Sequence, residues 1–287
     1  MIIVKSYLTL CRPYIALFAA LSATAGYLLP AGKTEGAIYP AIAVFLLACG
    51  ASALNQVQER DIDGKMDRTR GRPLPSGKLA AGKAVLLAAC LIGTGLLQLG
   101  AMGGYKPFLL GIVSLLWYNG IYTHLKKMTA FASIPGAVVG MIPPAIGWVS
   151  AGNTLLDARL MAVCFLFFIW QIPHFWLLVL NHGEEYARAG LPSLTSRMSK
   201  AQIRRITFIW INAAAISSFA LPLYGSLRSG LTIFALVPLA SWVIWNGASL
   251  VSGYPVFPSH RLFRRINAYL FLMMMIISLD KVFSVLQ

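Results

Sequence analysis

The chain has 287 residues, of which 58% are hydrophobic and only 11% are charged. This composition excludes an ordinary soluble domain and an intrinsically disordered chain. A net charge of +15 would suggest a nucleic-acid partner in a soluble protein, but here the positive charges lie between apolar segments, in a pattern typical of membrane proteins. We therefore expect no nucleic acid among the partners.

Apolar segments long enough to cross a membrane recur along the whole chain. A helix needs about 20 apolar residues to span a hydrocarbon core of roughly 30 Å, and its backbone amides must find partners within the helix. The sequence therefore predicts an all-α integral membrane protein, with residues 1–287 forming one domain, a bundle of nine transmembrane helices. The predicted spans are 13–30, 38–57, 84–102, 105–122, 131–150, 159–180, 206–224, 230–251 and 265–286. The first is expected to be a retained helix, because no small-residue cleavage pattern of a signal peptide is evident.

The lysines and arginines predict the orientation of this bundle. If the N-terminus is cytoplasmic, all but five of the 24 basic residues fall on the cytoplasmic side of the nine spans. Such an asymmetry follows the positive-inside rule. We therefore expect a protein of the cytoplasmic (inner) membrane of the cell, with the N-terminus in the cytoplasm and the C-terminus outside.

Acidic residues are rare and clustered. Six of the nine lie in two segments that leave the cytoplasmic ends of the second and sixth spans: Glu59, Asp61, Asp63, Asp67, Glu184 and Glu185. Both segments carry Asn-x-x-x-Glu, as Asn55 with Glu59 and Asn181 with Glu185. Similar polar elements four spans apart hint at an internal repeat of helices, a plan that places a site between two halves.

Continued as a helix, the first segment places Asn55, Glu59, Asp63 and Asp67 at successive i+4 positions on one face. Like charges at this spacing repel one another. The basic residues of the segment fall on the other side of the helical wheel: Arg60, Lys65, Arg68 and Arg72. A solvated loop neutralised by its neighbours is one interpretation. A divalent cation bound by hard oxygen ligands, with Asn55 adding a neutral carbonyl oxygen, accounts better for the row.

The chemistry around such a cation indicates a phosphate ligand. Magnesium held by one or two carboxylates completes its coordination with water and substrate phosphate. Arg68 and Arg72 carry planar guanidinium groups that bind phosphate in a bidentate way. The sequence therefore predicts a diphosphate site at the membrane surface. The apolar helices beneath it predict that the substrate also has a hydrophobic tail. An isoprenyl diphosphate has this shape.

Several stretches in the same order resemble one family. Asn55-x-x-x-Glu59-x-x-x-Asp63 followed by MDRTRGRPLPSG is similar to the first aspartate-rich motif of the UbiA family of intramembrane prenyltransferases. Four further stretches resemble the branch of that family that farnesylates haem b: YTHLKKMT (122–129), PPAIGW (143–148), WQIPHFW (170–176) and EYARAGLPSL (185–194). The resemblance runs from the first span to past residue 200. It implies a central cavity capped on the cytoplasmic side, Mg²⁺ as cofactor, and farnesyl diphosphate and haem b as substrates.

The resemblance also implies roles for individual residues. Magnesium on the two acidic segments would help to ionise the diphosphate to an allylic cation, which a vinyl group of haem b attacks. The metal ligands would be Asn55, Glu59, Asp63 and Glu185, of which the three carboxylates act in catalysis. The leaving diphosphate would be stabilised by Arg68, Arg72 and Lys127.

Aromatic and imidazole side chains are candidates for the apolar part of the site. Tyr118 and Tyr122 lie one turn apart and offer a π surface to the cation, although tyrosines also anchor spans at the membrane interface. His174 is the one histidine inside a span, and ionisable residues there are functional by default. It is expected to bind the haem iron or orient the acceptor. Alternatively, it bonds to a backbone carbonyl freed by Pro173.

Some positions depart from the pattern of the family and bear on the acceptor. Relatives generally carry aspartate where Glu59 and Glu185 stand, and both TSRMSK after Leu194 and FASIPG at the fifth span differ from the usual sequence. We expect a farnesyltransferase acting on haem b, with a quinone precursor or another aromatic acceptor as the alternative. A transporter or a haem carrier without catalysis explains the clustered acids and arginines less well. Further expected partners are membrane lipid and haem-modifying or terminal-oxidase assembly proteins.

Overall fold

The computed structural model describes residues 2–30, 34–252 and 259–285, and every regular element in these ranges is a helix. Eight helices are long and apolar enough to cross a membrane. A ninth span results if α1 (Ile2–Cys11) and α2 (Pro13–Leu28), which meet at an angle of 44°, are counted as one broken helix. The predicted all-α class with up to nine spans agrees with this architecture.

The predicted spans all correspond to helices, and the differences lie at their ends. The remaining bounds are α3 Ile38–Gln58, α4 Arg60–Asp63, α5 Ala81–Gly103, α6 Tyr105–Leu115, η1 Leu116–Tyr122, α7 Thr123–Met128, α8 Ser133–Gly136, α9 Val138–Ser150, α10 Ala158–Arg188, η2 Leu194–Ser196, α11 Lys200–Ser217, α12 Ala220–Leu223, α13 Gly230–Ala248 and α14 Ser259–Val285. Helix α1 was not predicted. Helix α10 continues past residue 180 to Arg188, so the second acidic segment is helical. Residue 286 of the last predicted span lies outside the described residues.

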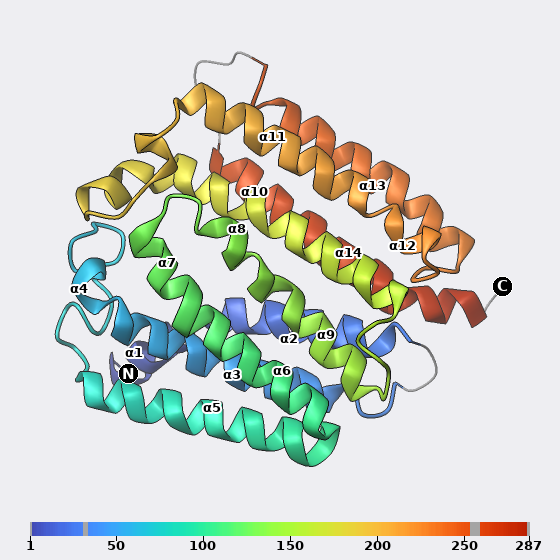
Figure 1. The fold of residues 1–287 in the computed structure, drawn as a ribbon, viewed down its shortest axis with the longest axis horizontal. Helices are drawn as coiled ribbons and strands as arrows, with labels where there is room; N and C mark the ends of the chain where they lie inside the picture. Colours follow the sequence, from blue (N-terminus) through green and yellow to red (C-terminus); the bar gives the residue numbers. More distant parts are fainter. Residues whose placement is uncertain (1, 31–33, 253–258, 286–287) are drawn as a thin grey trace.

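The long helices form a closed ring. Each contacts the next in the order α2, α3, α5, α6, α9, α10, α11, α13 and α14, and α14 returns to contact α2. Further contacts join α2 to α9 and α10 to α14. The start of α1 and the end of α14 lie towards opposite ends of the long axis (Figure 1). The acidic segments after α3 and at the end of α10 lie at the same end as the start of α1 (Figure 1).

Glycines bring α2 and α9 into backbone contact. A Cβ atom added at Gly147 would lie 1.9 Å from the Ala23 carbonyl oxygen, and one added at Gly26 would lie 2.0 Å from the Pro144 carbonyl oxygen. In lipid, helices associate through such close packing of small residues, because the apolar surroundings supply no hydrophobic driving force between them. Contact between α2 and α9 thus depends on the absence of side chains at these two positions.

The first prediction concerns this contact. Gly147→Ala should destabilise the folded protein by about 1–3 kcal/mol, because the added methyl group overlaps a backbone atom that cannot move independently. Thermal unfolding in detergent measures the effect. Gly93→Ala is the matched control, since Gly93 is also helical and has nothing within 4 Å of the added Cβ. Equal melting temperatures for the two variants would contradict the prediction.

Candidate active site

The first acidic segment begins as a helix and then turns. α3 ends just before Glu59, whose φ is −104° and ψ is 5°, and α4 adds one further turn. The backbone N–H of Glu59 still donates to the Asn55 carbonyl (2.9 Å), and the N–H of Asp63 donates to the Glu59 carbonyl (2.8 Å). Asn55, Glu59 and Asp63 therefore lie one turn apart, as the sequence predicts.

The other two acids of this segment lie outside that row. Asp67 falls in the turns beyond α4, where its carboxylate pairs with Arg70 at 3.3 Å. Asp61 pairs with Arg60 at 3.3 Å, and its side chain is 87% exposed. The prediction that Asp67 continues the row is wrong, because the helix does not extend past Gly64. Asp61 is solvated as expected.

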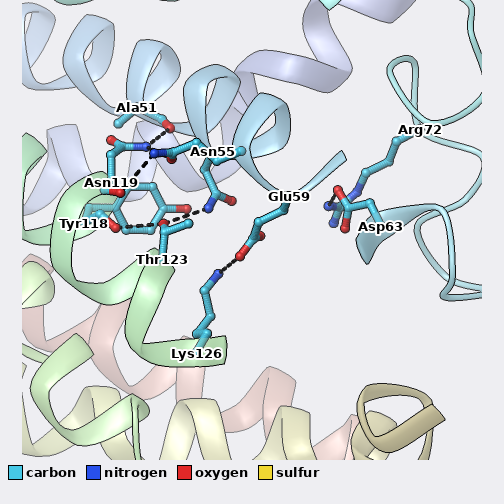
Figure 2. Close-up of polar contacts among 10 residues, drawn as sticks. Ala51, Asn55, Glu59, Asp63, Arg72, Tyr118, Asn119, Thr123 and Lys126 are labelled. Atoms are coloured by element: carbon cyan, nitrogen blue, oxygen red, sulfur yellow. Dashed lines mark hydrogen bonds and ion pairs between the residues drawn. The ribbon is translucent and has the colours of Figure 1, made fainter. Parts of the chain in front are cut away.

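Each carboxylate of the row contacts a basic side chain. Lys126 Nζ lies 2.5 Å from Glu59 Oε1, and Arg72 Nη1 donates to Asp63 Oδ2 at 2.6 Å (Figure 2). The expectation that Arg72 points away from the acids is wrong, because the chain after α4 folds back. Burial and the nearby Arg12 cation lower the pKa of Arg72, whereas Asp63 raises it. Arginine remains protonated despite such effects.

Asn55 lies at the inner end of the row and is almost completely buried. Its Nδ2 donates to Thr123 Oγ1 at 3.0 Å, and the Thr123 hydroxyl donates to the Tyr118 carbonyl at 2.9 Å. Because the nitrogen is held by Thr123, the amide oxygen lies on the side of Glu59 (Figure 2). A neutral oxygen there suits a hard cation bound by the neighbouring carboxylates.

Reciprocal hydrogen bonds hold α3 against the π-helix η1. Asn119 Nδ2 donates to the Ala51 carbonyl at 3.0 Å (Figure 2). It also donates to Gln58 Oε1 (3.1 Å), while Gln58 Nε2 donates to the Asn119 carbonyl (3.0 Å). These bonds set the position of α3 relative to η1 and α7. They therefore set the position of Glu59 relative to Lys126. Sequence reasoning missed Gln58 and Asn119, although a polar Asn119 within an apolar span was a usable signal.

Tyr122 faces the interior of the bundle. Its ring is buried and lies 6.0 Å from the Tyr118 ring and 5.7 Å from the Phe175 ring, measured between centroids. Lys126 Nζ lies 4.9 Å from the Tyr122 ring centroid. A cation is thus already in contact with the surface that the sequence assigns to an allylic cation. The ring fits because residue 136 is glycine, where an added Cβ would lie 2.5 Å from Tyr122 ring carbons.

Lys126, and not Lys127, contacts the acidic row. Lys127 is exposed, whereas Lys126 is partly buried between Glu59 and Tyr122. Neighbouring residues of a helix point in different directions, so only one of two adjacent lysines can face the site. The placement of Lys127 does not support its predicted contact with a diphosphate, and Lys126 takes its place among the candidates.

The second acidic segment meets the first through Glu185. The backbone N–H of Arg68 donates to Glu185 Oε2 at 3.4 Å, and His182 Nδ1 lies 3.8 Å from Glu185 Oε1. The Arg68–Glu185 bond joins the last turns of α10 to the loop that follows α4, whereas His182 lies on α10 itself, one turn before Glu185. Two segments more than a hundred residues apart therefore lie against each other at one end of the bundle, as the predicted site requires.

The two Asn-x-x-x-Glu segments are not equivalent. Asn181 Oδ1 accepts a hydrogen bond from Ser259 Oγ at the start of α14, so its oxygen is already engaged by the protein. The Asn55 amide is held by its nitrogen instead. Glu184, next to the candidate residue Glu185, pairs with Lys200 at 2.7 Å on the surface.

The oxygen donors of the first acidic segment are of the chemical kind that magnesium binds. In the part of the chain that the structure describes, no three His, Cys, Asp or Glu side chains form a ready metal cluster. The predicted ligands are instead arranged as the row Asn55, Glu59 and Asp63, with Glu185 on the adjoining segment. Magnesium commonly uses only one or two carboxylates and completes its octahedron with water and phosphate oxygens. A row of hard oxygen donors beside arginines satisfies that requirement.

His174 joins α10 to α14. Its Nδ1 lies 2.8 Å from Asn267 Oδ1, and its ring centroid lies 4.7 Å from that of Trp170 and 4.8 Å from that of Phe263. The alternative of a bond to a backbone carbonyl freed by Pro173 is wrong for Nδ1, because the partner is a side chain of another helix.

Arg12 is a further cation that sequence reasoning did not select. It lies at the break between α1 and α2 with φ +46°, a left-handed conformation that is uncommon for residues other than glycine. Its charge affects Arg72, as does that of Arg68, so the three arginines lie within electrostatic range of one another. Strained backbone of this kind clusters at functional sites. The sequence signal that could have identified Arg12 is the Arg12-Pro13 pair, which interrupts an otherwise apolar stretch.

These features define a class: an all-helical integral membrane protein whose acids and arginines meet at one end of the bundle. The chain matches the UbiA prenyltransferase family over residues 14–271. It belongs to this family and is a prenyltransferase, which confirms the resemblance seen in the motifs.

Individual relatives and solved structures agree with this assignment. A protoheme IX farnesyltransferase of Geobacter sulfurreducens is 44% identical over 234 residues, covering 81% of this chain and 86% of the relative. Another from Oleidesulfovibrio alaskensis is 34% identical over 276 residues, covering 95% of each chain. A UbiA homolog from Archaeoglobus fulgidus, solved with DMAPP and Mg²⁺, has a TM-score of 0.70 at 16% identity, covering 96% of this chain and 99% of its own. That likeness confirms the fold.

The second prediction separates the two lysines. Lys126→Ala should lower kcat/KM for prenyl transfer by about 100-fold, because it removes a cation beside Glu59 and Tyr122 that is positioned to stabilise developing negative charge. Lys127→Ala is the matched control and should change kcat/KM less than about threefold. Steady-state kinetics with purified variants measure both. A larger loss of kcat/KM from Lys127→Ala than from Lys126→Ala would show that Lys127 is the lysine that contacts the diphosphate.

The third prediction concerns the ring of Tyr122. Gly136→Ala should displace this ring and lower turnover by about 10- to 100-fold, since small displacements in a reacting site are costly. Gly120→Ala is the control, because an added Cβ at that position of η1 meets nothing within 4 Å. Turnover and melting temperature are measured together. Normal turnover in folded Gly136→Ala protein would show that the ring position is unimportant.

Proposed function

We propose that this protein transfers the farnesyl group of farnesyl diphosphate to a vinyl group of haem b, with Mg²⁺ assistance, and so forms haem O. Relatives named protoheme IX farnesyltransferase support the choice of substrates. The observation that carries the proposal is the meeting of the two acidic segments, where the backbone N–H of Arg68, in the loop that follows the Asp63 turn, donates to Glu185. It creates a polar site directly above apolar helices.

The reaction begins when the bond between the farnesyl C1 and the diphosphate oxygen breaks, and its electron pair leaves with the diphosphate. Bound magnesium would supply Lewis-acid stabilisation of that leaving group. Arg72 and Lys126, which neutralise Asp63 and Glu59 in this structure, would turn to the diphosphate oxygens and leave the carboxylates and the Asn55 oxygen for the metal. In this exchange the carboxylates would pair with the metal and the two basic side chains with the diphosphate, so each charged group would keep a partner of opposite charge.

The allylic cation then needs a dry site and an electron-rich partner. The rings of Tyr118 and Tyr122 offer π faces to the cation, and their position among apolar helices limits access of water. The terminal vinyl carbon of haem b bonds to the farnesyl C1. Addition of water to the resulting cation and loss of a proton give the hydroxyethylfarnesyl group.

The location of the site follows from the same proposal. We propose that residues 1–287 form a single prenyltransferase domain in the cytoplasmic (inner) membrane. The basic segments would lie in the cytoplasm, with the N-terminus on that side and the C-terminus outside. Farnesyl diphosphate would then enter from the cytoplasmic leaflet with its tail between the helices. Delivery of haem to later modifying or oxidase-assembly proteins would occur within the same membrane.

The decisive measurement is an acceptor assay. Purified protein is given labelled farnesyl diphosphate and Mg²⁺ with either haem b or 4-hydroxybenzoate. We expect a farnesylated product from haem b and none from the aromatic acid, and chelation of Mg²⁺ should abolish the product. A product from 4-hydroxybenzoate alone would assign the enzyme to aromatic acceptors, and no product with any acceptor would favour a carrier.

The fourth prediction tests the acidic row. Asp63→Asn should lower turnover by at least about 1,000-fold, because it removes the charge of a buried candidate metal ligand. Asp61→Asn is the matched control two residues away, since the Asp61 side chain is exposed and its carboxylate pairs with the neighbouring Arg60. Turnover is measured across a range of Mg²⁺ concentrations. Activity of Asp63→Asn close to that of the control would show that Asp63 belongs to an ordinary loop.

A further inference from the structure

The hydrogen bond between His174 and Asn267 fixes the imidazole tautomer. The Asn267 atom 2.8 Å from His174 Nδ1 is the amide oxygen, which can only accept. Nδ1 must therefore carry the proton, and Nε2 of the neutral ring keeps its lone pair. A histidine that donates one N–H to a carbonyl oxygen and presents the other nitrogen has the arrangement seen in metal-ligating histidines.

The ring is also held in one orientation. Trp170 and Phe263 lie 4.7 and 4.8 Å from its centroid. Trp170 itself is fixed, because its indole N–H donates to the Ile266 carbonyl at 2.8 Å. Two neighbouring residues of α14, Ile266 and Asn267, thus bind two residues of α10 one turn apart. His174 remains half-buried rather than enclosed, so the ring keeps accessible surface within the membrane-spanning part of α10.

A series of aromatic contacts leads from His174 to the place assigned to the allylic cation. The His174 ring lies 5.6 Å from that of Phe175, which lies 5.7 Å from that of Tyr122. Tyr122 is in turn 6.0 Å from Tyr118. A flat acceptor bound at His174 would therefore lie next to the rings that border the donor.

We propose that His174 Nε2 is the axial ligand of the iron of the porphyrin acceptor, and that Asn267 is the positioning residue that presents it. This inference rests on haem b being the acceptor. Coordination would fix the macrocycle at its centre and bring an edge to Tyr122, so the iron serves for binding and takes no part in bond formation. The chemical class of ligand is an iron porphyrin with a free axial position.

Optical titration with ferric haem b tests the ligand directly, without farnesyl diphosphate. Wild-type protein should shift the Soret band on binding, and His174→Ala should lose that shift and bind at least about 10-fold more weakly. Added imidazole should restore the shift in His174→Ala, because it supplies the missing nitrogen. His124→Ala is the matched control, since this exposed histidine lies on α7 and bonds to the Gly120 carbonyl of the preceding turn. It should behave as wild type.

Variants of Asn267 test the positioning role. Asn267→Asp keeps an oxygen that accepts from Nδ1 and should retain the Soret shift, with a lower midpoint potential of the bound haem because the imidazole becomes more basic. Asn267→Leu removes the acceptor and should weaken haem binding by about 10- to 100-fold. A structural role alone predicts no change in the midpoint potential of Asn267→Asp.

The outcomes separate this inference from the proposed function. If wild-type protein and His174→Ala show the same haem spectrum and the same kcat/KM with haem b, the ligand assignment is wrong while haem remains the acceptor. If wild-type protein neither binds haem b nor farnesylates it, the proposed function itself fails. Metal-free protoporphyrin IX gives a further check. It keeps the vinyl groups, so His174→Ala should process it as well as wild type does.

Discussion

Charge neutralisation at the end of an apolar bundle is the constraint on which the site depends. Asp63 is 2% exposed, and an isolated carboxylate at such a position would be strongly destabilised. Arg72 supplies the opposite charge at 2.6 Å, and Lys126 does the same for Glu59 at 2.5 Å. Removing one member of a buried pair typically costs about 3–5 kcal/mol, because the other charge is left uncompensated. The acids and bases therefore have to be placed together, and a ligand that carries both a metal and a diphosphate can replace both kinds of contact.

This constraint explains why the surrounding structure is rigid. The exchange of partners works only if Glu59 and Lys126 start from fixed positions. Asn119 and Gln58 fix them by joining η1 to α3 with three hydrogen bonds. Gly136 allows Tyr122 to lie against α8. A π-helix is rare and appears frequently at functional sites, which agrees with the position of η1 beside the acidic row.

The sequence predicted the spans well and the orientation of single side chains less well, for physical reasons. Spans depend on composition averaged over about 20 residues, so each one was found. Side-chain direction depends on helical phase, which is lost wherever regular α-helix stops. The row was correct from Asn55 to Asp63 and failed at Asp67, where the chain turns. Likewise η1 inserts i→i+5 turns before Lys126, which changes the phase of every residue after it. Lys127 was chosen from the resemblance of its stretch to the family, and that resemblance does not establish which of two adjacent lysines faces the acidic row.

The last third of the chain illustrates a second limit of motifs. This part of the sequence contains no recognisable motif, yet its helix α14 closes the ring on α2 and packs along α10. Its Ser259 binds Asn181, and its Asn267 binds His174. The bond from Ser259 engages the amide oxygen of Asn181. In the first acidic segment, the corresponding amide oxygen belongs to Asn55, whose amide is held by its nitrogen instead. Under the proposed function, metal binding would thereby be biased towards Asn55, Glu59 and Asp63, and Glu185 would be the contribution of α10. A helix without a recognisable motif thus makes the two similar segments different, because its Ser259 engages the Asn181 oxygen of the second segment.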